Sequence, residues 1–162
     1  WASTLFSVAC LQGGPIGATD ATVEVEAIYH ATQCPSTPIE PHGSWIDSPV
    51  GLGQLWNHLH RLSLGGRSLA SPEVDFSVDG LLLVHMGQQR TGGYAIELAD
   101  PIAQVKDGIA SVLVDWITPL PDTVVTQMIN APCILLKLQK SDFSSIQVID
   151  QDGRVRVVVD VR

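Results

Sequence analysis

The sequence is short of positive charge. It has nine Lys and Arg against 17 Asp and Glu in 162 residues, which gives a formal net charge of −8. Proteins that bind nucleic acid need cations to neutralise phosphates, and the cations of this chain are scattered rather than clustered. The same shortage argues against an anionic membrane surface. We therefore expect neither nucleic acid nor such a surface among the partners.

Long apolar runs are also missing. No run approaches the roughly 20 residues of a transmembrane helix, so no transmembrane segment is expected. The first residues are mildly apolar but lack the basic start of a signal peptide. The stretch "LFSVAC", which ends at Cys10, resembles a lipoprotein processing site. Lipidation of Cys10 is one interpretation, and an ordinary strand or tail that ends in a cysteine is the one we favour.

Only three cysteines are present, and none forms a CxxC pair, which argues against a zinc ribbon or a redox dithiol. Cys10 and Cys34 each flank a polar segment that contains proline or glycine, and they could form a disulfide if the chain is secreted. Cys133 lies in "PCILL", a pattern typical of a buried strand. A buried free cysteine usually behaves as a small hydrophobe, so we interpret Cys133 as a core residue and not as a nucleophile.

The common catalytic motifs are absent. The sequence contains no GxGxxG, GxSxG or HExxH, and its five histidines are dispersed. His58 and His60 lie two residues apart on an expected helix, so they point to nearly opposite sides and cannot form a metal pair. Glu24 and Glu26 are interpreted as solvated residues of a strand, although a catalytic carboxylate pair is left open by the sequence. We expect no catalytic residue, no metal and no cofactor, with an enzyme as the less favoured alternative.

The secondary structure is expected to be mainly strands with one helix. Ser48 can cap a helix that begins at Pro49, and leucines with Trp56 form its apolar stripe until Gly65 and Gly66 end it. Strands are predicted at residues 21–34, 80–86, 94–99, 102–105, 109–117, 124–129, 133–138, 145–149 and 154–161. Residues 35–43 are predicted to be loop because they contain three prolines. The fold class is α+β and mainly antiparallel, a sandwich or barrel-like sheet with one packed amphipathic helix. We expect residues 1–20 to be an N-terminal extension or linker and residues 21–162 to form one domain.

A glycine-rich loop between two expected strands is the most distinctive feature. Its residues are Gly87, Gln88, Gln89, Arg90, Thr91, Gly92, Gly93 and Tyr94. Two of the glycines have the spacing of a phosphate-binding loop, but the Lys and Ser or Thr of GxxxxGK[ST] are missing and a strand follows in place of a helix. Two interpretations are left: the loop is only a tight hairpin turn, or it is the surface that a partner protein contacts.

An ordered series of short motifs gives the loop a context. The series consists of Val74-Asp75-Phe76, Val84-His85-Met86-Gly87, Thr91-Gly92-Gly93-Tyr94, Pro119-Leu120-Pro121, Val125-Thr126-Gln127 and Ala131-Pro132. This series resembles the C-terminal domain of the PrcB-like family of protease-complex subunits, most strongly over residues 75–140. The chain departs from the family pattern at Gln89-Arg90 and at Cys133.

The resemblance implies a non-catalytic, exported bacterial protein of the periplasm or cell envelope. Its expected role is to assist or stabilise an envelope or secreted protease complex through protein contacts. The family has no agreed catalytic residues, and its members indicate neither the partner nor the oligomeric state.

Two alternative functions are also considered. The Thr-Gly-Tyr character of the 87–94 loop is similar to that of chagasin-type inhibitors of cysteine proteases, which present such a loop from a β-sandwich. A loop held in order by a rigid sheet loses less entropy on binding, so a protease inhibitor is one alternative. A small-ligand-binding envelope protein is the other.

Overall fold

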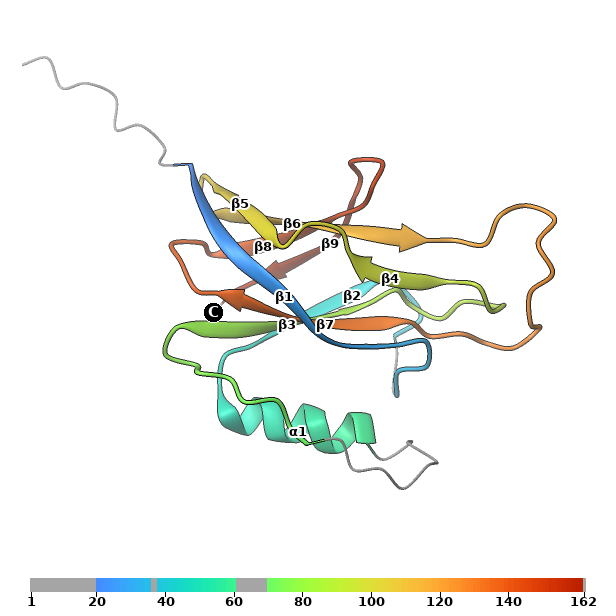
Figure 1. Ribbon diagram of the computed structural model, residues 1–162, viewed down its shortest axis with the longest axis horizontal. Coiled ribbons are helices and arrows are strands. Elements are labelled where there is room, and N and C mark those ends of the chain that lie inside the picture. Colours follow the sequence, from blue (N-terminus) through green and yellow to red (C-terminus); the bar gives the residue numbers. More distant parts are fainter. Residues whose placement is uncertain (1–19, 36–37, 61–69, 162) are drawn as a thin grey trace, which may run out of the picture.

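The computed structural model describes residues 20–35, 38–60 and 70–161. Figure 1 shows one helix beneath a strongly curved sheet. The elements in chain order are β1 (Ala21–Ala31), β2 (His42–Ile46), α1 (Pro49–His60), β3 (Asp79–His85), β4 (Ala95–Leu98), β5 (Ile102–Lys106), β6 (Ile109–Ile117), β7 (Cys133–Gln139), β8 (Ser145–Ile149) and β9 (Val155–Asp160). None of the helices in these ranges is long and apolar enough to cross a membrane.

The sheet curls into a nearly closed barrel. Its strand order is β2-β3-β7-β1-β5-β6-β8-β9, and β4 pairs with β6 beside this path. All pairings are antiparallel except that of β6 with β8, which is parallel. The two end strands approach each other: a Cβ on Gly43 of β2 would lie 2.7 Å from Cγ1 of Val157 on β9. The expected α+β class is confirmed, with the barrel-like form of the sheet.

β3 and β7 are buried on both faces. Leu82 and Val84, with Met86 just after β3, belong to the apolar cluster inside the barrel. Leu81 and Leu83 belong to a second cluster between the sheet and α1. β7 divides in the same way, because Leu136 lies inside the barrel and Leu135 faces the helix. Burial on both faces explains why these two strands are continuously apolar, while strands with one wet face alternate.

The predicted helix is confirmed from Pro49 onward. The Ser48 hydroxyl accepts a hydrogen bond from the backbone N–H of Gly51 at 3.3 Å, as an N-cap does. Leu52 and Leu59 are buried in the cluster against β3 and β7. The expected end of the helix at Gly65 and Gly66, with Leu62, lies outside the described residues.

A β-bulge in β1 turns side chains of the second half of the strand toward the opposite face of the sheet. The register against β7 shifts between Ala27 and Tyr29, so residues beyond the bulge no longer continue the alternation of the first half of the strand. Tyr29 consequently lies on the helix side, where its ring meets that of Trp56 edge-on at 5.8 Å. The bulge therefore helps β1 to hold α1.

Three expectations about the strands are wrong. Residues 124–129 form no strand, and Val124 is 99% exposed. The strand at residues 94–99 does not pair with the strand before it, because β4 pairs with β6. β2 lies partly in the range predicted to be loop, since prolines obscured a short edge strand whose side chains are only half-buried.

The turn between β8 and β9 agrees with the sequence prediction and is closed by Asp150. One of its carboxylate oxygens accepts hydrogen bonds from the backbone N–H groups of Asp152 at 2.9 Å and Arg154 at 2.8 Å. The other accepts from the Arg156 guanidinium at 2.6 Å. Burial opposes ionisation of Asp150, but these three bonds outweigh it and hold the pKa of the carboxyl below its ordinary 3.8.

Candidate functional site

Two long connections lie together at one end of the barrel, on the right in Figure 1. One is the 87–94 loop, which joins β3 to β4. The other joins β6 to β7 and is called here the 118–132 segment. Gln89 and Asn130 exchange two backbone hydrogen bonds, of 2.7 and 2.9 Å, and the N–H of Gly92 donates to the carbonyl of Thr126 at 2.9 Å. The two connections thus form one surface.

The 87–94 loop is not a hairpin turn. β3 pairs with β2 and β7, whereas β4 pairs with β6, so the loop carries the chain from one part of the barrel to another. The interpretation of its glycines as residues of a tight hairpin is therefore wrong. Gly87 instead has a φ of 84°, and a Cβ there would lie 2.6 Å from the carbonyl oxygen of Ile39. Glycine is required because the backbone is left-handed and tightly packed against another segment.

Asn130 fixes the distance between the two connections. It is buried, and its side-chain amide donates to the carbonyl of Tyr94 at 3.0 Å. Its backbone meanwhile bonds Gln89 at the other end of the loop. The Asn130 side-chain oxygen accepts from the N–H of Ala131 at 3.1 Å, so both polar atoms of the buried amide have a partner. The 118–132 segment therefore holds the 87–94 loop near both ends.

The eight predicted site residues differ in their access to solvent. Gln88, Arg90 and Gly93 are exposed; Gln89, Thr91, Gly92 and Tyr94 are half-buried; Gly87 is buried. Tyr94 packs against the apolar interior of the barrel. Only part of the loop is thus open to a partner. Tyr94, its one aromatic side chain, is partly buried against the core and is only partly available for binding.

The 118–132 segment contributes exposed apolar surface that was not expected from the sequence. Leu120, Val124, Met128 and Ile129 are each at least 60% exposed. Exposed apolar side chains scattered singly are ordinary, but a group of them on one connection is typical of an interaction site. Residues 124–129 were predicted to be a strand because apolar residues occur there. Prolines at 119 and 121 and the lack of strict alternation are the signals that favoured a loop.

A cleft of ≈350 Å³ lies where the two connections meet the end of β1. Its walls include Gln33, Tyr94, Thr126, Met128 and Ile129. The Gln33 side-chain amide donates to the carbonyl of Ile129, which ties the rim of the cleft to β1. Apolar and uncharged polar side chains line the cleft, and none of the described residues that line it is charged, so it suits an apolar side chain or a short uncharged segment.

The cysteines pair differently from the prediction. Cys34 forms a disulfide with Cys133, with a Cα–Cα distance of 6.0 Å, so the expected Cys10–Cys34 pair is corrected. Cys34 follows β1, and its N–H donates to the carbonyl of Ala131 at 2.8 Å, which brings it beside the start of β7. Cys133 is fully buried as expected, but it is a disulfide partner and not a free thiol. Cys10 lies outside the described residues.

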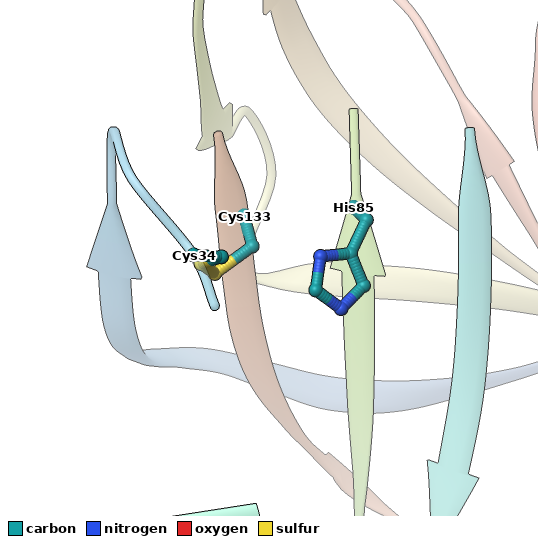
Figure 2. Close-up of side chains that lie close together, drawn as sticks. All are labelled: Cys34, His85 and Cys133. Carbon is teal, nitrogen blue, oxygen red and sulfur yellow. A yellow bond between two sulfur atoms is a disulfide. The ribbon is translucent and has the colours of Figure 1, made fainter. Parts of the chain in front are cut away.

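His85 lies beside this disulfide, directly opposite Cys133 on the neighbouring strand (Figure 2). Its Nδ1 is buried and has no hydrogen-bond partner among the described residues. Burial lowers the pKa of His85 to about 4, and the nearby His42 and His58 add to the shift. The imidazole is therefore neutral at physiological pH.

Glu24 and Glu26 line a second cleft, of ≈340 Å³, on the outer face of β1. Glu26 forms an ion pair of 2.6 Å with Lys137, and this hydrogen bond raises the pKa of the lysine. The carboxylate of Glu26 is thus engaged by a cation, as expected for a solvated residue of a strand. Among the described residues that line this cleft, no arrangement indicates a catalytic carboxylate pair.

Fold and site together define a barrel-like β domain with a surface built from two interlocked loops at one end. Residues 81–139, from β3 to β7, match the family described as PrcB C-terminal, which confirms the resemblance noted in the sequence. The match covers less than half of the 162 residues but includes both connections. No curated protein and no solved structure matches the chain significantly.

Proposed function

We propose that this protein is a non-catalytic accessory subunit that binds and stabilises a protease complex of the bacterial envelope or a secreted protease. The family match over residues 81–139 is consistent with an accessory role in a protease complex. The observation that carries the proposal is the exposed apolar side chains of the 118–132 segment beside the 87–94 loop.

The physical form of this surface suits a protein partner. Backbone hydrogen bonds between the two connections and the Asn130 side chain hold the surface in one conformation before binding, which lowers the entropy lost in the complex. Apolar side chains such as Val124 and Ile129 provide area that a partner can bury, and polar residues such as Gln88 and Arg90 are exposed on the adjoining loop.

The disulfide supports export. Disulfides persist in oxidising compartments such as the periplasm and are rare in the cytosol. A buried link between Cys34 and Cys133 therefore fits a protein that folds or functions outside the cytosol.

The test is recovery of a protease from the native envelope with the purified chain as bait. The double substitution Val124→Asp and Ile129→Asp places charges where a partner would bury apolar surface, and we expect at least about a tenfold loss of recovered protease. Val50→Asp is the matched control, because Val50 is 71% exposed but lies in the first turn of α1, where an acidic residue suits the helix dipole.

Each result decides a different part of the proposal. Equal recovery by the double variant would show that the 118–132 segment is not the contact surface. Recovery of no protease by the wild type would overturn the accessory function. Inhibition of papain-like proteases at micromolar concentration, lost on replacement of Thr91 to Tyr94, would establish the chagasin-like alternative instead.

A further inference from the structure

Three metal-binding side chains converge beneath the two connections. The sulfur atoms of Cys34 and Cys133 and a ring nitrogen of His85 all lie within 4.8 Å of one another, and all three residues are buried. Figure 2 shows the imidazole beside the disulfide, with one nitrogen on the side of the ring that faces the sulfur atoms. His85 ends β3, Cys133 begins β7, and Cys34 follows β1. The pairing of these strands and the hydrogen bond from Cys34 to Ala131 fix the three positions.

One ring nitrogen of this histidine is left without a partner beside the disulfide, within the part of the chain that the structure describes. His85 is 7% exposed, and its Nδ1 has no hydrogen-bond partner among the described residues. A buried polar atom without a partner is costly and calls for an explanation. A leucine or valine would fill the same space, as such residues do elsewhere on β3, without leaving a nitrogen unsatisfied.

We propose that Cys34, Cys133 and His85 form a Zn²⁺ site when the disulfide is reduced. Two thiolates and one neutral imidazole are ligands that zinc prefers. Two negative thiolates and one divalent cation sum to zero charge, so the complex avoids the penalty of a net charge in the interior. Zinc with three protein ligands keeps its fourth position for water or another small ligand.

The geometry needs only small adjustments. Zn–S bonds of about 2.3 Å and Zn–N bonds of about 2.0 Å in a tetrahedron place the ligand atoms about 3.5–3.8 Å apart. The present separations fall within 4.8 Å, and opening the disulfide lets the two sulfur atoms move to such a distance. The metal would replace the disulfide by coordinate bonds to the same two cysteines. Through His85 it would also connect β3 to them.

The two states exchange by a balanced reaction. A phosphine reductant and one water convert the disulfide into two thiols and a phosphine oxide, with transfer of two electrons to the sulfur atoms. Binding of Zn²⁺ then displaces one proton from each thiol, and the imidazole donates a lone pair without releasing a proton. Disulfide and metal site are therefore mutually exclusive uses of the same cysteines.

The test is titration of the full chain with Co²⁺, whose complexes with thiolates are coloured, and competition with Zn²⁺. Protein reduced by a phosphine is expected to bind one equivalent, with a sulfur-to-cobalt charge-transfer band and tetrahedral d–d bands. Oxidised protein is expected to show neither. Added Zn²⁺ should bleach the bands and raise the melting temperature of the reduced protein only.

Variants identify the ligands. Loss of a residue that merely orients a metal ligand costs about 10- to 100-fold in affinity, so His85→Ala, which removes a ligand, is expected to cost at least that much. His30→Ala, at an exposed position of β1, is the matched control and should bind as the wild type does. Circular dichroism of each reduced variant shows whether it is folded.

Three results would overturn the proposal. The first is that reduced wild-type protein, folded or not, takes up no more Co²⁺ or Zn²⁺ than the Cys34→Ser/Cys133→Ser variant. The second is that a folded His85→Ala variant binds with unchanged affinity and spectrum. The third is that oxidised protein binds equally well, which would place the metal elsewhere.

Discussion

The β8–β9 turn and the 87–94 loop are both polar connections that contain glycine, but they are held in different ways. Asp150 stabilises its turn through hydrogen bonds from Asp152, Arg154 and Arg156, all within six positions along the chain. The 87–94 loop depends on Asn130 and Thr126, which come from another connection, and on Ile39. A locally closed turn can be recognised in the sequence, whereas a loop closed by distant partners cannot.

The difference also explains which connection is suited to binding. The β8–β9 turn uses its own polar groups, and Gln151 adds two hydrogen bonds to the backbone of Trp116, at 2.8 and 3.2 Å. The side chains of Asp150 and Gln151 are thus used in hydrogen bonds within the domain and are less available to a partner. The other pair of connections is held mainly through backbone atoms, and therefore leaves side chains such as Val124 and Gln88 exposed to solvent.

The largest effect is expected from removing the disulfide that fixes the base of the two connections. The chain closed by Cys34 and Cys133 spans 99 positions, and loss of a native disulfide in a small domain costs about 2–5 kcal/mol. We expect this loss for Cys34→Ala/Cys133→Ala in urea unfolding. Hydrogen exchange should increase in the 118–132 segment more than in the β8–β9 turn, and equal increases would contradict the distinction between the two.

A smaller effect is expected from Asn130→Ala, which leaves the carbonyl of Tyr94 without its side-chain donor. Loss of a buried hydrogen-bond partner costs about 1–3 kcal/mol. The measurement is the free energy of unfolding, with Asn57→Ala on the exposed face of α1 as control, expected to stay within about 0.5 kcal/mol. An Asn130→Ala variant as stable as the control would show that the 87–94 loop does not need its distant partner.

The mildest effect concerns acid and the β8–β9 turn. The pKa of Asp150 is held below 3.8 in the folded protein, so its ionised form stabilises the fold above that value. This contribution is lost as the pH falls from about 3.8 through the folded pKa, because the unfolded chain takes up the proton first. Asp150→Asn should be less stable at neutral pH and should lose less stability on acidification.

Asp160→Asn is the control for that measurement, because Asp160 is exposed at the end of β9. Unfolding midpoints between pH 5 and about pH 2.5 would show the difference between the two variants. If Asp150→Asn and the wild type lose stability in parallel over this range, the hydrogen bonds of the turn do not depend on the charge of Asp150.

The parts of the fold that follow from local sequence were predictable. Ser48-Pro49 marked the start of α1. The gap between the strands predicted at 102–105 and 109–117 marked the β5–β6 turn, where Asp107 and Gly108 have positive φ. β3 and β7 were recognised by their continuous apolar runs. The pairing of β4 with β6 was not predictable, because a strand of four residues can satisfy its alternation against any neighbour.

The candidate site was predictable only in part. The 87–94 loop was identified by its glycines and by the PrcB-like series, but the 118–132 segment was not, because its apolar residues were assigned to a strand. The Cys34–Cys133 link depends on the registers of three strands, which bring His85 and Cys133 side by side. Spacing along the chain contains no such information. The sequence therefore suggested Cys10 and Cys34, which each flank a polar segment, and Cys133 was interpreted as a core residue.

The range of residues that matches the family is not a part of the chain that can complete the barrel by itself. The matched range, residues 81–139, contains β3 with β7 and, apart from them, β4, β5 and β6. In the strand order, β1 lies between these two groups, since it pairs with β7 on one side and with β5 on the other. An excised 81–139 fragment would lack β1 between β7 and β5, and would also lose β2 from the edge of β3 and β8 from the edge of β6. A recombinant that exchanges residues 81–139 would therefore have to preserve the contacts of β5 and β7 with a β1 from another parent.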